Sequence, residues 1–163
     1  MNAFWSYFWP LFASGLVFGA AFGTLAFRKR RRALFAIGVL VSLATAAFWH
    51  GPLGAADRFA AKVESTAEFV LGDWEMSQVQ AQLHHGPLTR RLMLSGPADE
   101  FQRGQLVLML GSIPGASSAT WSKDGGWPLL LEAAGASLLG FLIGAMLAYL
   151  IELRRRHNAQ WKW

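Results

Sequence analysis

The sequence predicts a helical membrane protein with three transmembrane helices and one small α+β domain of order α-β-β-α-β outside the membrane. Hydrophobic residues make up 53% of the 163 residues, and they concentrate in three long stretches that carry almost no charge. Between the second and third stretches, hydrophobic residues instead follow the spacing of amphipathic helices and half-buried strands. A spanning helix needs about 20 apolar residues in succession, whereas a helix in a soluble core cannot use so many.

The three apolar stretches define the predicted organisation of the chain. The first begins without Lys or Arg and ends in a basic run, so we expect a retained helix and not a cleaved signal peptide. The stretches cover residues 3–27, 33–56 and 127–153. The predicted parts are residues 1–54 with two helices and a basic loop at 28–32, an external domain over 55–123, a third helix over 127–153, and a basic and aromatic tail over 154–163.

The basic residues predict the orientation of the helices. Residues 28–32 form one cluster and residues 154–156 another, and short basic loops are retained in the cytoplasm. The N-terminus and residues 51–127 are then expected on the opposite side. That segment is slightly acidic, although the chain carries a net charge of +5. We therefore attribute the excess of basic residues to the orientation of the helices and not to nucleic-acid binding. Because the chain has no cysteine, the external domain cannot be held together by disulfide bonds. We expect a multi-pass protein of a bacterial inner membrane with a periplasmic domain.

Aromatic and acidic side chains are expected at the membrane boundaries. Glu132 lies in the first turn of the third helix, where the helix dipole and water stabilise a carboxylate. Glu152 is expected to pair with the arginines that follow it. Trp rings favour the boundary because one end is apolar and the other is wet. The expected anchors are Trp5, Trp9, Trp49 and Trp127 on the outer side, and Trp161 and Trp163 on the inner side.

Each predicted membrane helix carries small residues at four-residue spacing, which places them on one face where another backbone can approach closely. Two interpretations stay open. The stripes pack on each other, or at least one of them contacts another membrane protein, the double GxxxG of the first helix being the leading candidate. The stripes are Gly15, Gly19 and Gly23; Gly38, Ser42 and Ala46; and Ala136, Gly140, Gly144 and Ala148.

The elements of the external domain are predicted from the spacing of hydrophobic residues, which changes along residues 55–123. Strict alternation in its middle predicts two antiparallel strands, and a crossover through a helix predicts a third strand parallel to one of them. The expected elements are a helix over 57–71, strands over 77–83 and 88–95 joined by a turn at 84–87, a helix capped by Asp99 that reaches about residue 110, and a strand over 116–121. The expected core is Val79, Leu83, Leu92, Leu94, Phe101 and Leu108.

Part of this domain resembles a known family. The run from Leu92 to Gly96, a helix containing Gln102 and Arg103, and the turn Ile113-Pro114-Gly115-Ala116 before a strand look like a BON domain, whose strand often reads V-x-L-x-G and whose turn reads G-V. Ala116 stands where that family usually has Val. The resemblance covers about residues 73–121 and implies a small module that binds phospholipid, envelope components or proteins, with no catalytic residues.

The chain shows few residues with catalytic or ligand-binding spacing. His84 and His85 are adjacent and lack the further converging ligands of a metal site, so a solvated turn is expected. His50 and Ala46 match the Ala-x-x-x-His spacing of light-harvesting polypeptides, but Gly51-Pro52 follows at once, which favours an interfacial position. No phosphate loop or dinucleotide fingerprint is present. We expect no metal, no cofactor and no catalytic residue, while bound lipid or pigment stays open.

Three functions are compatible with these features. The first is a non-enzymatic accessory subunit of a larger inner-membrane complex, respiratory or photosynthetic, that binds other integral membrane proteins and membrane lipid. The second is a stand-alone envelope protein whose BON-like domain binds phospholipid or a periplasmic partner. The third, an enzyme or transporter, is disfavoured because the membrane helices carry no paired buried charges and no broken-helix site.

Overall fold

A computed structural model of the chain describes residues 2–122 and 125–160. It divides into two compact units, which we describe separately. The domain unit contains the residues up to Tyr7 together with Gly54–Glu132. The helical unit contains Phe8–Leu53 and the residues from Ala133 onward.

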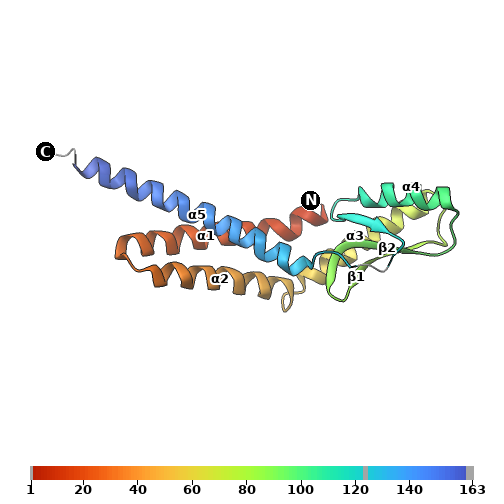
Figure 1. The fold of residues 1–163 in the computed structure, drawn as a ribbon, viewed down its shortest axis with the longest axis horizontal. Coiled ribbons are helices and arrows are strands. Elements are labelled where there is room, and N and C mark those ends of the chain that lie inside the picture. Colours follow the sequence, from red (N-terminus) through yellow and green to blue (C-terminus); the bar gives the residue numbers. More distant parts are fainter. Residues whose placement is uncertain (1, 123–124, 161–163) are drawn as a thin grey trace. The chain divides into compact units, whose positions relative to one another are not determined.

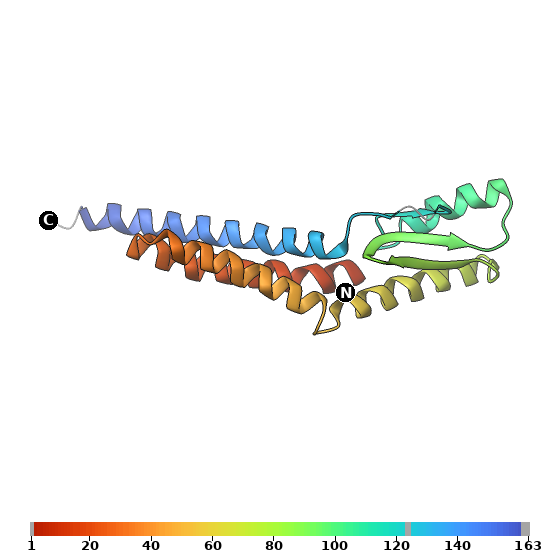
Figure 2. The same cartoon turned by 60° about the horizontal axis from the view of Figure 1, so that its bottom comes forward.

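Three long helices form the helical unit: α1 (Ala3–Lys29), α2 (Arg32–His50) and α5 (Leu129–Gln160). As predicted, all three are long and apolar enough to cross a membrane, and they run side by side (Figures 1 and 2). α2 ends at His50, before the end of its apolar stretch, because Gly51-Pro52 cannot continue the helix. α5 continues through the arginines to Gln160, so the separate tail predicted from residue 154 is helical as far as the structure describes it.

The domain unit has the predicted order α-β-β-α-β. Its middle strands are antiparallel, and the last strand pairs in parallel with the second, giving the sheet order β1-β2-β3. The crossover through α4 produces this parallel pairing. The elements are α3 (Ala55–Asp73), β1 (Gln80–His85), β2 (Leu88–Ser95), α4 (Glu100–Gly111) and β3 (Ser118–Thr120).

One face of this sheet forms the core of the domain unit. Leu83 pairs with Leu92, which in turn pairs with Ala119, so the three side chains lie on one face and all are buried. On the opposite face, Gln82 and Met93 are exposed and partly exposed. α3 contacts β1, and α4 contacts β2 and β3. Because only one face is buried, both helices cover that face.

The predicted core is right for the sheet and wrong for α4. Val79, Leu83, Leu92 and Leu94 are at most 4% exposed, whereas Phe101 and Leu108 are 76% and 70% exposed. α4 instead buries Leu106 and Leu110, which are one turn apart. Hydrophobic residues occupy two faces of this helix, so its periodicity does not indicate which face meets the sheet.

The start of α4 and the hairpin between β1 and β2 test two further predictions. Asp99 caps α4 as predicted, and its side chain forms a reciprocal capping box with Gln102. The predicted turn over residues 84–87 is too long, since His84 and His85 belong to β1 and only Gly86-Pro87 connect the strands. Two residues suffice to join antiparallel strands. The pairing continues to the turn with an irregularity, because the register shifts between Leu83 and His85.

Candidate functional site

The closest contact between helices in the helical unit joins α1 and α5. A Cβ atom added to Gly15 would fall on the backbone carbonyl of Ser137, and one added to Gly19 would fall on that of Phe141. One turn further, a Cβ on Gly23 would lie 3.0 Å from the Cα of Ala145. The contacts advance together along both helices, so α1 and α5 are parallel here. The stripe of α1 therefore faces a helix of the same chain.

The small residues of α5 complete this contact from the other side. A Cβ on Gly140 would fall on the carbonyl of Phe12, and one on Gly144 on that of Leu16. Glycines and facing carbonyls thus alternate across the contact, an arrangement in which Cα–H groups point at carbonyl oxygens. Ala148 is buried as well, whereas Ala136 is only partly buried.

The third stripe, on α2, packs antiparallel on the same pair of helices. A Cβ on Gly38 would meet the rings of Phe22 and Phe141, and Ala46 is 1% exposed. Ser42 and Ser137 are fully buried, with their hydroxyl oxygens 2.7 Å apart, and the Ser137 hydroxyl donates to the Ser42 carbonyl at 3.1 Å. Hydroxyl pairs of this kind stabilise helix contacts in lipid. The stripe prediction missed Ser137, which lies beside Ala136 on the helix.

A second cluster lies in the domain unit around Arg90 on β2. Its guanidinium donates to the Glu132 carboxylate at 2.7 Å and to the Gly115 carbonyl at 2.9 Å, and it lies 5.0 Å from the centre of the Phe4 ring. The side chains of Arg90 and Glu132 are 19% and 29% exposed. This ion pair joins positions 42 residues apart in the sequence, so no local pattern could reveal it. It links the first turns of α1 and α5 to the sheet.

The packing around Arg90 requires a glycine at position 115. Its φ of +116° is one that side chains rarely adopt, and a Cβ would lie 2.7 Å from Val63. The Tyr7 ring packs next to this turn, 5.3 Å from the ring of Phe59 and only 2% exposed. The cluster is assembled by packing and one ion pair, and it contains no nucleophile poised next to a base.

α4 presents an apolar surface away from the sheet. Phe101 and Leu108 lie seven residues apart and therefore share one helix face, where both are largely exposed. Between them, a Cβ on Gly104 would meet no atom within 4 Å. On the side of α4 nearer the sheet, the Arg103 guanidinium lies 5.0 Å from the centre of the Trp121 ring, and the Trp121 indole N–H donates to the Arg103 carbonyl. We call Phe101, Gly104 and Leu108 the α4 face.

The histidines of β1 contact local partners. His84 Nδ1 lies 3.0 Å from the Pro87 carbonyl, and His85 Nε2 lies 3.1 Å from the Glu64 carboxylate. The same carboxylate accepts a hydrogen bond from the Leu83 backbone N–H at 2.8 Å. Glu64 thereby occupies part of the open edge of the sheet. Within residues 2–122 and 125–160, no group of three His, Asp or Glu side chains is placed to hold a metal ion.

The predicted anchors and charges of the membrane boundaries fall at helix ends. Trp5 and Trp9 are half exposed near the start of α1, Trp49 lies in the last turn of α2, and Trp127 precedes α5. Trp161 and Trp163 lie outside the described residues. Glu152 is paired as predicted, 3.4 Å from Arg156, and is also 3.4 Å from Arg28.

Comparisons of the chain with models of protein families, with curated proteins and with solved structures give no match. The BON-like interpretation of residues 73–121 therefore stays a prediction, carried by the short motifs of the sequence and not by a relative.

Proposed function

We propose that the protein is a non-catalytic accessory subunit of a larger membrane complex, held in the membrane by α1, α2 and α5 and docked on its partner through the α4 face. The observation that supports this is the exposure of Phe101 and Leu108, at 76% and 70%, on one side of a helix whose other side is buried. Large apolar residues grouped on a surface mark sites of interaction.

The chemistry of α4 favours a protein partner over a lipid surface. Helices that lie on membranes carry several Lys or Arg on their polar face. α4 carries one acid, Glu100, and one base, Arg103. Aromatic residues such as Phe101, in contrast, are enriched in protein interfaces. The partner we propose is the domain of another integral membrane protein on the same side of the membrane, in a respiratory or photosynthetic complex.

The docking proposal is tested by purifying the tagged full chain from its own membranes in mild detergent and quantifying the integral membrane proteins retained. Phe101→Ser and Leu108→Ser should release a partner that the unchanged chain retains. Phe69→Ser is the matched control, because Phe69 is 70% exposed on α3. Release by all three variants, or by none, would contradict docking through the α4 face.

The orientation we propose places the domain in the periplasm and the arginine clusters in the cytoplasm. Contacts of Arg28 and Arg156 with Glu152 support a common side for both clusters, and basic loops are retained in the cytoplasm. A reporter active only in the periplasm should work when fused near Gly125 and fail when fused after Trp163. The reverse pattern would overturn the orientation.

A further inference from the structure

The turn between α1 and α2 places an arginine where a glycine is expected. α1 ends at Lys29, and the backbone N–H of Arg31 donates to the Ala26 carbonyl at 3.2 Å, the six-to-one bond of a Schellman motif. The residue between them, Arg30, has a φ of +51°. That position usually holds glycine, because a Cβ is strained in the left-handed conformation. A side chain retained in such a conformation suggests a function for it.

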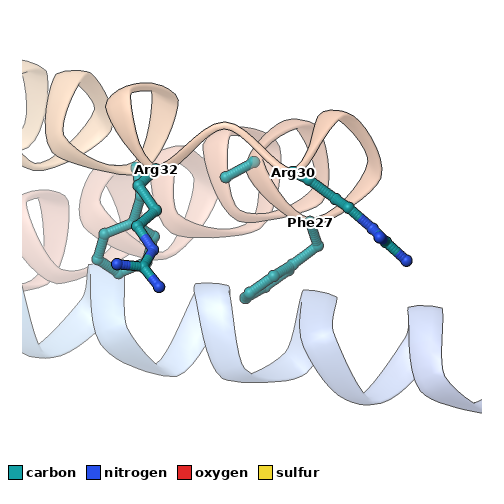
Figure 3. A pocket seen from close by; sticks show the side chains of 5 residues that line it. Phe27, Arg30 and Arg32 are labelled. Atoms are coloured by element: carbon teal, nitrogen blue, oxygen red, sulfur yellow. The ribbon is translucent and has the colours of Figure 1, made fainter.

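Arg30 lines two hollows that flank the ring of Phe27. The larger, of about 590 Å³, is also lined by Ala26, Arg32 and Phe35. Figure 3 shows the Phe27 ring and the Arg32 guanidinium on the side of the turn that faces α5, with the Arg30 side chain extended past the ring. Each hollow therefore combines an apolar wall with a guanidinium group.

The second hollow, of about 310 Å³, lies between the turn and α5. Beyond Phe27 and Arg30, its lining residues are Tyr149, Glu152, Leu153 and Arg156. The Phe27 and Tyr149 rings pack with centres 5.2 Å apart. Phe27 thus forms a common wall of the two hollows, and Arg30 reaches both.

Positive charge at this end of the helical unit far exceeds negative charge. Residues 28–32 and 154–156 supply eight basic side chains, and Glu152 is the only acid between residues 133 and 160. Glu152 contacts Arg28 and Arg156. Across residues 2–122 and 125–160, Arg30 and Arg32 have neither an ion pair nor a side-chain hydrogen bond. Their charge is therefore available to an anion.

We propose that this turn is a binding site for an anionic phospholipid, with the phosphodiester held by Arg30 and Arg32 and an acyl chain lying along Phe27 and Phe35. Arginine binds phosphate oxygens through paired N–H donors. Basic hollows between membrane helices at the headgroup level take anionic lipids. The apolar wall, at the end of helices long enough to span a membrane, favours a lipid over free phosphate. This site is independent of the α4 face.

The test measures lipid binding to the purified full chain in neutral detergent by native mass spectrometry. The probes are dioleoylphosphatidylglycerol, dioleoylphosphatidylcholine with the same acyl chains, and inorganic phosphate. Phosphatidylglycerol should bind, and the other two should not compete with it. Arg30→Gly should weaken this binding about tenfold or more, the effect of losing hydrogen bonds to a charged group. Arg31→Gln removes the same charge outside both hollows and should change binding by less than about twofold.

Arg30→Gly also separates binding from folding, because glycine relieves the left-handed conformation of residue 30. Its thermal unfolding midpoint should equal or exceed that of the unchanged chain while lipid binding falls. Asparagine also tolerates the left-handed conformation, so Arg30→Asn should likewise weaken lipid binding without lowering the unfolding midpoint. Equal losses in Arg30→Gly and Arg31→Gln, unchanged binding in Arg30→Gly, or equal binding of phosphatidylcholine or free phosphate would each overturn the site. Lower midpoints in both Arg30 variants would overturn the argument from strain.

Discussion

Alanine at Gly19 should separate α1 from α5, although it changes the chain by a single methyl group. The added Cβ falls on the backbone carbonyl of Phe141, which cannot rotate away as a side chain can. The helices must then move apart locally. Cα–H···O contacts contribute about 0.5–1 kcal/mol each, and four glycines make such contacts in this interface, so they carry about 2–4 kcal/mol together.

Overpacking of a closed interface typically costs about 1–3 kcal/mol, and we expect Gly19→Ala to lower the free energy of unfolding by about 2 kcal/mol. Helix propensity acts in the opposite direction, since alanine favours a helix by up to about 1 kcal/mol over glycine. Gly135→Ala measures the contribution of helix propensity alone, because Gly135 lies in α5 with no atom within 4 Å of an added Cβ. This control should be neutral or slightly stabilising.

The assay is equilibrium unfolding of the full chain in dodecylmaltoside by increasing sodium dodecyl sulfate, followed by far-UV circular dichroism. Gly19→Ala should shift the midpoint to lower denaturant, and Gly135→Ala should leave it in place or raise it. Coincident curves for Gly19→Ala and Gly135→Ala would refute the inferred close contact between α1 and α5.

Three further predictions concern the domain unit. Leu94→Asp places a charge at a position that is 4% exposed, so it should cost about 3–5 kcal/mol and make the domain protease-sensitive, whereas Leu108→Asp at a 70% exposed position should not. Arg90→Met and Glu132→Gln should each lower stability by about 1.5–3 kcal/mol, and a double-mutant cycle should give a non-zero coupling; additive losses would contradict the ion pair. Asp99→Ala removes the cap of α4 and should cost about 1 kcal/mol in thermal unfolding; an unchanged midpoint would contradict its role.

Prediction from the sequence succeeded where a local pattern has one structural solution. The strand over 88–95 was predicted at its observed bounds, because alternation with Leu92 and Leu94 on one face fits only a half-buried strand. It failed where two solutions exist. α4 carries apolar residues on two faces, and the buried face is Leu106 and Leu110 because those residues meet the sheet. The exposure of Phe101, which supports the proposed docking, is the direct consequence of that choice.

The sequence by itself determined the three apolar helices, the order of elements in the domain, the capping of α4 by Asp99 and the clustering of arginines at the helix ends. Each of these depends on residues a few positions apart, whose interactions are set by helix or strand geometry. Only the tertiary structure decided that the glycines of α1 meet carbonyls of α5, and that Arg90 pairs with Glu132. These contacts join residues far apart in the chain, and their partners depend on how whole elements pack. The left-handed conformation of Arg30 was not predicted either, although the bond that closes its turn joins residues only five positions apart, because the basic run around it carries no glycine to indicate such a turn.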